Sequence, residues 1–313
     1  MAADSVVSGW GRLAELGAWL ATVQDHQPPV PFRRVRVVIF AADHDAAAGT
    51  ESSYSAEQTA RLAAEIRAGG TAVNVAARAA GATVRVVDVA RGSDPPDSDP
   101  PDSERAVAGG RAVADAEVDA GADLLVPGVI GIGNGTGAAA LVAGLTDSEP
   151  VAVVDRGPGD DAGWARQVGF VRAALLRARG CRHDPVALLD CCGGPAIAAL
   201  TGLLAQAAQR RTPVVLDGAV AAVAGLLAER LMPGARAWWV AGTRSPEPAQ
   251  KLALAQLGLI PLLDLSLRAE DGTGALLAVP LLAAAGSVAR DGTRGGAGGA
   301  GAAGSDDDDY GYG

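Results

Sequence analysis

The sequence predicts an α/β protein with a largely parallel, Rossmann-like sheet and helices on both of its faces. Runs of β-branched residues alternate with amphipathic helical runs along most of the chain, a pattern typical of parallel sheets. Apolar residues make up 49% of the 313 residues, which is enough for a large core. A glycine-rich segment, Gly128–Thr136, stands between a predicted strand and a predicted helix, where such sheets bind ligands.

Two periodicities define the individual elements. A continuous β-branched run such as Val35–Ala41 predicts a buried strand, whereas apolar residues at helical spacing, as in Trp10–Val23, predict a helix that the following prolines end. In chain order, the elements after this first helix are strand Val35–Ala41, helix Ala56–Ala68, strand Thr83–Val89, helix Arg105–Ala120, strand Asp123–Pro127, helix Thr136–Gly144, extended segment Pro150–Asp155, helix Ala162–Arg179, helix Ile197–Gln209, strand Pro213–Asp217, helix Val220–Leu231, strand Ala237–Ala241, helix Ala249–Gly258, strand Pro261–Asp264 and helix Ala275–Ala289, with a kink or late start at Pro280.

Two segments are predicted to lack regular structure. Arg91–Ser103 contains four prolines among Asp and Ser residues. After Ala289 the chain turns to Gly, Ala and Arg and then to an acidic run, a composition that cannot bury a core. We therefore expect a disordered tail over residues 291–313.

The charge balance and the cysteine content exclude several classes of protein. A formal net charge of −10 without a basic cluster argues against binding of nucleic acid or of anionic membrane surfaces. The absence of a signal sequence and of an uncharged run of 18 apolar residues predicts a cytoplasmic protein without a membrane span. Cys181, Cys191 and Cys192 form no disulfide framework, and no second Cys/His pair stands at ligand spacing, so we expect no metal site.

The strongest chemical signal is the segment Gly128-Val-Ile-Gly-Ile-Gly-Asn-Gly-Thr136. Glycines allow the backbone N–H groups to approach an anion closely, and the start of the next helix adds a favourable dipole. The segment therefore predicts a site for a phosphate or a nucleotide. The alternative is a plain glycine turn between a strand and a helix.

Further motifs stand in the order found in one known family. The glycine-rich segment resembles G-E-M-G-I-G-N-T-T of the nicotinate-nucleotide–dimethylbenzimidazole phosphoribosyltransferases. Other segments that are similar to motifs of this family are Val37–His44, Gly69–Asn74, Gly193–Leu200, Pro213–Gly218, Ala241–Pro248, Leu262–Arg268 and Asp271–Ala275. The resemblance extends roughly from Gly11 to Val288.

The resemblance implies a homodimer in which the two ends of each chain add a small helical subdomain to the α/β core. Accordingly, residues 1–30 are expected to form the N-terminal helical segment of the subdomain. Residues 31–275 then form the α/β core, 276–290 the C-terminal helix of the subdomain, and 291–313 the tail.

The resemblance also implies a reaction, the transfer of phosphoribose from nicotinate mononucleotide to 5,6-dimethylbenzimidazole for the lower ligand of cobalamin, without a cofactor. The substrate-binding residues that it implies are Gly131, Ile132, Gly133, Asn134, Gly193, Gly194, Asp217, Gly242, Ser245, Gly272, Thr273 and Gly274. Backbone N–H groups of the first four are expected to hold the phosphoribosyl group. Two local alternatives stay open: Asp217 could cap the following helix, and Arg244 could pair with Glu247 at the surface.

The chain departs from the family pattern where an acid is expected. Val129 stands in place of a Glu in the glycine-rich segment, and no Glu follows Glu270, although the family has a Glu base shortly after its last helix. A missing general base costs about 10²–10⁴-fold in rate. The catalytic residue is therefore unknown from the sequence, with His44, Asp45 and Asp291 as the candidates.

Three hypotheses follow for the function. The first is an active phosphoribosyltransferase with an altered acceptor or base. The second is a catalytically impaired homologue that binds a phosphoribosyl nucleotide or pairs with an active paralogue. The third is an enzyme of another pathway that uses a phosphoribosyl substrate without a benzimidazole. The acceptor is not determined by the sequence.

Overall fold

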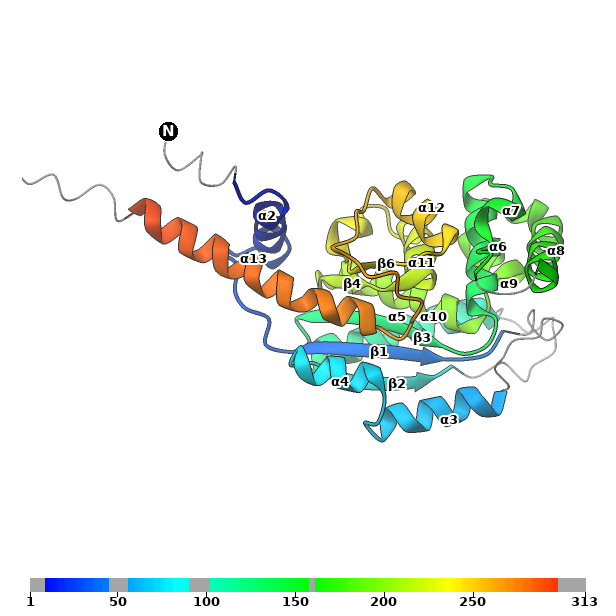
Figure 1. Cartoon of the computed structure of the whole chain (residues 1–313), viewed down its shortest axis with the longest axis horizontal. Coiled ribbons are helices and arrows are strands. Elements are labelled where there is room, and N and C mark those ends of the chain that lie inside the picture. Colours follow the sequence, from blue (N-terminus) through cyan, green and yellow to red (C-terminus); the bar gives the residue numbers. More distant parts are fainter. Residues whose placement is uncertain (1–8, 45–55, 90–101, 158–160, 298–313) are drawn as a thin grey trace, which may run out of the picture. The chain divides into compact units, whose positions relative to one another are not determined.

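A computed structural model of the chain describes residues 9–44, 56–89, 102–157 and 161–297 (Figure 1). The chain divides into two compact units. One unit comprises Phe32–Pro280, and the other comprises Met1–Pro31 together with Leu281–Gly313. The sheet and all the predicted substrate-binding residues belong to the first unit.

The main sheet has five parallel strands in the order β2-β1-β3-β4-β5. Its strands are β1 (Val35–Ala41), β2 (Thr83–Asp88), β3 (Leu124–Ile130), β4 (Val214–Leu216) and β5 (Trp239–Ala241). A separate parallel pair joins β6 (Thr243–Arg244) to β7 (Leu263–Asp264). The predicted α/β fold class is thus confirmed, while β6 had no counterpart in the sequence prediction.

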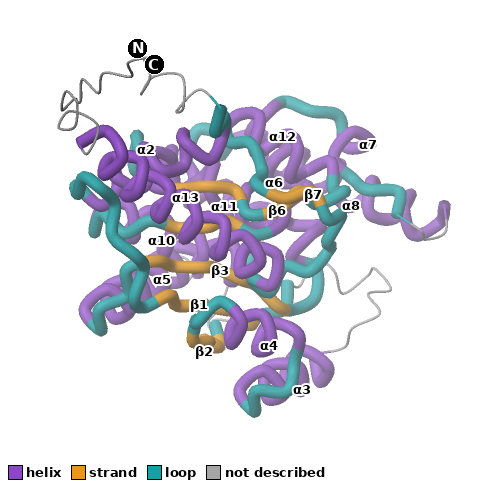
Figure 2. Tube along the Cα trace, turned by 60° about the vertical axis from the view of Figure 1, so that its left-hand side comes forward, coloured by secondary structure: helices purple, strands orange, loops and turns teal. Residues whose placement is uncertain are grey.

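Helices connect the strands and cover both faces of the main sheet (Figure 2). The helices of the described residues, in both units, are α2 (Arg12–Gln24), α3 (Ala56–Arg67), α4 (Ala72–Ala79), α5 (Asp102–Asp119), α6 (Asn134–Thr146), α7 (Pro150–Val153), α8 (Asp161–Arg177), α9 (Pro185–Cys192), α10 (Pro195–Gln209), α11 (Gly218–Leu231), α12 (Pro248–Leu257) and α13 (Thr273–Ala297), with short 3₁₀ turns at Ala178–Gly180 and Ala235–Trp238. Of these, α2 and the part of α13 from Leu281 onward belong to the second unit. Val38 and Phe40 of β1 join the large core formed with α5, α10 and α11. The alternate residues of β1 point to the opposite face, on which α3 and α4 pack.

Three short helices differ from the sequence prediction. Pro150–Val153, predicted to be extended, is helical because Pro150 stands at the first helical position, where its fixed φ suits a helix. α4 and α9 were not predicted from the sequence. The Asp184 carboxylate accepts hydrogen bonds from the N–H groups of Val186 and Ala187 and so starts α9.

Some predicted boundaries are wrong because tertiary contacts extend the elements. β3 continues through Gly128–Ile130, so only residues 131–133 form a loop before α6 begins at Asn134. α5 begins at Asp102, inside the segment predicted to be unstructured, and the Ser103 N–H donates to Asp190. Residues 90–101 lie outside the described part of the chain. α13 runs through Pro280 to Ala297 and so includes residues 291–297, which were predicted to belong to the tail.

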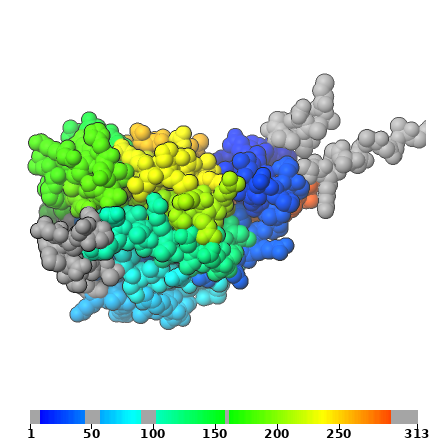
Figure 3. All heavy atoms as spheres, turned by 180° about the vertical axis from the view of Figure 1, so that it is seen from behind, coloured from blue at the N-terminus to red at the C-terminus, as the bar shows by residue number. Residues whose placement is uncertain are grey.

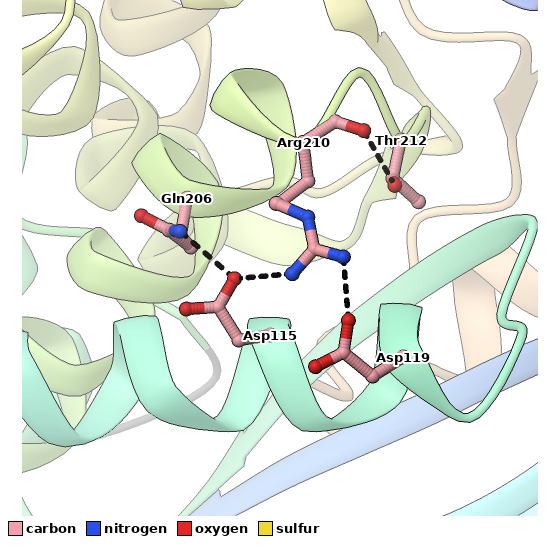
Figure 4. Close-up of polar contacts among 5 residues, drawn as sticks. All are labelled: Asp115, Asp119, Gln206, Arg210 and Thr212. Carbon is pink, nitrogen blue, oxygen red and sulfur yellow. Dashed lines mark hydrogen bonds and ion pairs between the residues drawn. The ribbon is translucent and has the colours of Figure 1, made fainter.

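α5 and α10 pack closely along one face of the first unit. α5 forms the teal band across the middle of the surface in Figure 3. Arg210, at the end of α10, donates to Asp115 and Asp119 of α5 at 2.6 Å each (Figure 4). Gln206 also donates to Asp115, and these hydrogen bonds from Gln206 and Arg210 lower the pKa of the Asp115 carboxyl.

We expect Gly110→Ala to destabilise the protein at this helix contact. A Cβ at position 110 would lie 1.8 Å from the carbonyl oxygen of Ala199, a backbone atom that cannot move alone. Overpacking of this kind costs about 1–3 kcal/mol. The neighbouring Gly109 has no atom within 4 Å of such a Cβ, so Gly109→Ala should be neutral or stabilising by up to about 1 kcal/mol. Urea unfolding of both variants tests this, and equal midpoints would contradict it.

In the second unit, α2 packs against the later part of α13. Gly17 allows this approach, because a Cβ there would lie 3.0 Å from the Ala289 side chain. Arg290 donates to the Pro29 carbonyl oxygen at 2.9 Å. Within the described residues, Thr273–Asp291 is the one helix long and apolar enough to cross a membrane by length and composition alone. A partly buried core helix passes the same test, so this is weak evidence for a span.

Candidate ligand site at the carboxyl edge of the sheet

The predicted substrate-binding residues gather at one edge of the main sheet. Parallel strands end at the same edge, and the segments that follow β1, β3, β4 and β5 there carry His44, Gly131, Asp217 and Gly242. β2 and β3 lie on opposite sides of β1. This reversal of strand order makes the ends of β1 and β3 the position at which parallel sheets bind ligands.

Asp43 holds the loop at residues 131–133 in place. Its Oδ1 accepts hydrogen bonds from the Ile132 N–H and from the Thr59 hydroxyl, each at 2.8 Å. The His44 N–H donates to the Ile132 carbonyl oxygen at 2.8 Å. Ile132 was predicted to offer its N–H to a phosphate, but that N–H is already bound to Asp43. Asp43 was not among the site residues predicted from the sequence, although it lies in the family-like segment Val37–His44.

The structure brings His44 and Gly194 together beside this loop. Gly194 has a φ of 75°, and a Cβ there would lie 2.1 Å from Cδ2 of His44. The His44 ring meets the Phe170 ring edge-on, with centroids 6.4 Å apart. Gly193 ends α9, and its carbonyl oxygen lies against Gly137 in the first turn of α6. Three predicted segments, two of them rich in glycine, therefore meet at the ends of β1 and β3.

Asp217 is buried, at 1% exposure, and does not cap the helix that follows it. Its carboxylate accepts hydrogen bonds from the Thr243 hydroxyl and from the N–H groups of Gly272 and Gly274, each at 3.1 Å. The local alternative of a helix cap is therefore wrong. Asp217 holds the loop at residues 272–274 against the ends of β4 and β6, so its contacts are with the protein itself.

Burial raises the pKa of Asp217 to about 7 from an ordinary value of 3.8, and the charge of Asp271 adds to the shift while the Thr243 hydroxyl opposes it. The folded protein therefore takes up a proton between about pH 4 and pH 7 that the unfolded chain does not hold. The contribution of this protonated carboxyl to the stability of the fold is fully present below about pH 4, and it is lost as the pH rises through about 7.

We expect the difference in unfolding free energy between wild type and Asp217→Asn to fall as pH rises from 5 to 7, by at most about 1.4 kcal/mol per pH unit. The Asn side chain does not titrate, so the variant removes this contribution and serves as the reference. Urea unfolding at each pH measures the difference. A difference that stays constant, or that grows with pH, would contradict the raised pKa.

Glu270 takes the capping position that Asp217 leaves. Its carboxylate accepts from the N–H groups of Ala219 and Val220, at 2.8 and 2.9 Å, in the first turn of α11. Its carbonyl oxygen accepts from the Val129 N–H at 2.6 Å. Glu270 was not predicted as a site residue, and the signal for it in the sequence is its position as the last Glu of the chain, directly before the Asp271–Ala275 motif.

The segment that follows β5 is organised by its own side chains. Gly242 approaches Ala275 so closely that a Cβ at position 242 would lie 2.7 Å from the Ala275 Cα. The Ser245 hydroxyl accepts from the Glu247 N–H at 3.1 Å. Arg244 lies 3.5 Å from Asp264 across the β6–β7 pair rather than beside Glu247. The local alternative of a pair between Arg244 and Glu247 is therefore wrong.

Two buried polar atoms at this edge lack a hydrogen-bond partner within the described residues. They are Oδ1 of Asn134, at the start of α6, and Oγ1 of Thr273, at the start of α13. The Asn134 amide nitrogen donates to the Ala42 carbonyl oxygen at 3.2 Å, which fixes the side chain. Buried polar groups are normally hydrogen-bonded, so these two atoms are available to accept from a water molecule or a polar ligand.

The three catalytic candidates differ in position. His44 lies beside the loop at residues 131–133. Asp45 lies outside the described residues. Asp291 is exposed on α13 and belongs to the second unit. His44 alone of the three is therefore placed at the site by the described part of the chain.

Cys191 and Cys192 end α9, whereas Cys181 follows the 3₁₀ turn that precedes it. The Sγ atoms of Cys181 and Cys191 are 2.7 Å apart. Burial raises the pKa of Cys191 to about 12, and the contact with Cys181 adds to this shift. The described residues contain no group of three or more His, Cys, Asp or Glu side chains suited to a metal ion.

Comparisons with known proteins agree with this geometry. A family model described as a phosphoribosyltransferase matches residues 5–298. Over 296 residues, the chain is 51% identical to the nicotinate-nucleotide–dimethylbenzimidazole phosphoribosyltransferase of Mycobacterium avium, covering 88% of this chain and 85% of the relative. The protein of the same name from Mycobacterium tuberculosis is 50% identical, with 88% and 82% covered. The crystal structure of CobT from Thermus thermophilus superposes with a TM-score of 0.83 at 36% identity, covering 90% of this chain and 91% of that one.

Proposed function

Because this chain belongs to the nicotinate-nucleotide–dimethylbenzimidazole phosphoribosyltransferase family, we propose that it transfers phosphoribose from nicotinate mononucleotide to 5,6-dimethylbenzimidazole or a related azole. The product of such a transfer supplies the lower ligand of cobalamin. The reaction needs no metal or organic cofactor, because the pyridinium ring of the donor is already a cationic leaving group.

The observation that carries the proposal is the loop at residues 131–133, fixed between Asp43 and His44 at the strand-order reversal. This loop ends at the amino end of α6, where a helix dipole favours an anion. The N–H groups of Gly131 and Gly133 are proposed to hold the phosphate. The unpartnered Oδ1 of Asn134 and Oγ1 of Thr273 are proposed to accept from ribose hydroxyl groups.

The remaining predicted residues are proposed to shape the site. Gly193 and Gly194 leave room beside the loop, because a side chain at position 194 would overlap His44. Asp217, Gly242 and Gly272 are buried, so we propose that they act by holding the loop at residues 272–274. Holding the two reactants in one orientation supplies a large share of the rate in such a transfer.

A release assay with the purified chain tests the proposal. Nicotinate mononucleotide is incubated with the chain and each member of a panel of azoles, including 5,6-dimethylbenzimidazole, and free nicotinate and the new riboside phosphate are separated chromatographically. We expect both products in equal amounts and only when an azole is present. Nicotinate release without an azole would instead indicate a hydrolase.

The impaired-homologue alternative gives a different result in the same experiment. It predicts that calorimetry detects binding of nicotinate mononucleotide while no azole causes nicotinate release. A paralogue partner would then restore turnover on mixing. A chain that neither binds nicotinate mononucleotide nor releases nicotinate under any condition would contradict both hypotheses.

The assembly and location of the protein are proposed by the same family membership. We propose a homodimer in the cytoplasm that acts on small molecules. Analytical ultracentrifugation of the full chain tests the dimer, and a sedimentation mass of one chain at micromolar concentration would contradict it.

A further inference from the structure

The segment that carries Glu270 crosses the end of β3 on the side facing β4. Leu125 is the only residue of β3 that pairs with β4, at Val214. Among the described residues, the later part of β3 therefore has no neighbouring strand on its β4 side. The Val129 N–H on that side donates to the Glu270 carbonyl oxygen at 2.6 Å. Gly128 packs so closely on Asp271 that a Cβ at position 128 would lie 2.5 Å from the Asp271 carbonyl carbon. Glu270 is therefore fixed beside position 129.

The Glu270 side chain extends from there to the start of α11. Its two carboxylate oxygens accept from Ala219 and Val220. A Cβ at Gly218 would lie 2.6 Å from the Glu270 Cδ, so only glycine leaves room for this carboxylate. The carboxylate thus lies at the start of α11, directly after Asp217 at the end of β4, while the Glu270 backbone lies against the end of β3.

Acidic groups surround this carboxylate. Burial raises the pKa of Glu270 well above its ordinary value, and the charges of Glu247 and Asp217 add to the shift, opposed by the N–H groups of Val220 and Ala219. Arg268 acts on Glu247 by its charge and is itself paired with Asp155. As a residue Glu270 is half-buried. A carboxylate with a raised pKa is suited to accept a proton near neutral pH.

Position 129 is where the sequence lacks an acid. Val129 stands in place of the Glu of the family motif, and no Glu follows Glu270. The Glu270 backbone is hydrogen-bonded to the backbone of Val129. The Glu270 carboxylate is therefore carried by a segment next to position 129, where the family motif has its Glu. His44 contacts the loop at residues 131–133 from the end of β1, and its N–H bonds to Ile132 rather than to Val129.

We propose that the Glu270 carboxylate is the general base that accepts the proton of the incoming azole, an inference that rests on the proposed function. One ring nitrogen of the azole attacks C1′ of the ribose with its lone pair. The C1′–N bond to the pyridinium breaks, and its electron pair stays on the nicotinate nitrogen. The N–H of the second azole nitrogen gives its proton to Glu270, and the riboside product leaves with a neutral ring.

Steady-state kinetics of Glu270→Gln across pH 5–9 test this inference. A Gln keeps an acceptor for the first turn of α11 but takes up no proton. We expect kcat to fall by about 100-fold or more, with the dissociation constant for nicotinate mononucleotide changed only a few-fold. In wild type, kcat should decline at low pH as Glu270 becomes protonated, and the variant should lack this decline. Calorimetry and thermal melting of the variant establish that it folds and binds the donor.

Two further variants make the test specific. Glu65→Gln removes the same charge from an exposed, i,i+4-paired side chain on α3 and should leave kcat and its pH profile unchanged. If Glu270→Gln does not fold, Glu270→Asp replaces it, because the shorter carboxylate keeps the charge and should retain the low-pH decline with a reduced kcat.

Several outcomes would overturn the inference. Turnover of Glu270→Gln within about threefold of wild type, or a low-pH decline that persists in it, would exclude Glu270 as the base. Loss of the decline in His44→Asn instead would assign the proton transfer to His44. Absence of nicotinate release by the wild-type chain would contradict the proposed function itself, whereas active wild type with an equally active variant contradicts only the role of Glu270.

Discussion

Asp217→Ala is expected to lower the free energy of unfolding by about 3–5 kcal/mol, because each buried donor left without a partner costs about 1–3 kcal/mol. The substitution leaves the N–H groups of Gly272 and Gly274 and the Thr243 hydroxyl without their acceptor. A loss of this size is a large fraction of the roughly 5–15 kcal/mol that is typical of folded proteins. The loop at residues 272–274 should lose its position, so turnover should fall together with stability.

Asp217→Asn is the matched control for this prediction. The Asn side chain has the shape of the protonated carboxyl and keeps one oxygen acceptor, so its cost should be within about 1–2 kcal/mol at pH 7. Urea unfolding at pH 7 measures both variants. If Asp217→Ala were as stable as Asp217→Asn, the three hydrogen bonds would not hold the loop as the structure indicates.

Gly131→Ala is expected to abolish most turnover. Gly131 has a φ of 133°, which L side chains rarely adopt, and a Cβ there would lie 1.9 Å from the Ala42 carbonyl oxygen. Both are backbone constraints, so the loop at residues 131–133 must move as a whole. A displacement of about 1 Å in a site can cost about 10²-fold in rate, and we expect kcat/KM for nicotinate mononucleotide to fall by about that factor.

Gly135→Ala controls for the loss of a glycine from the same segment. Gly135 lies in the first turn of α6, and no atom lies within 4 Å of a Cβ at that position. Its kcat/KM should stay within about twofold of wild type, because a helical Gly→Ala change without a clash is mild or stabilising. Equal losses in the two variants would show that the loop geometry at Gly131 is not the cause.

The α/β fold class and most of the strands were predictable from the sequence alone. The β1 run Val35–Ala41 was predicted to the residue, because a buried strand of a parallel sheet is a continuous β-branched run between polar boundaries. Motifs in the family order identified the segments that meet at the carboxyl edge of the sheet. This worked because a parallel sheet places the end of every strand at one edge, so chain order alone brings those segments together.

The hydrogen-bond partners at that edge, in contrast, are known only from the three-dimensional structure. Ile132 was predicted to offer its N–H to a ligand, but Asp43, 89 residues away in the chain, already accepts from it. Asp217 is predicted to line the substrate site, and the alternative that it caps its own helix is wrong: it accepts from residues 26 to 57 positions away, and Glu270 caps that helix instead. Hydrogen bonds depend on distances of about 3 Å, which neither periodicity nor motif spacing specifies for residues far apart in the chain.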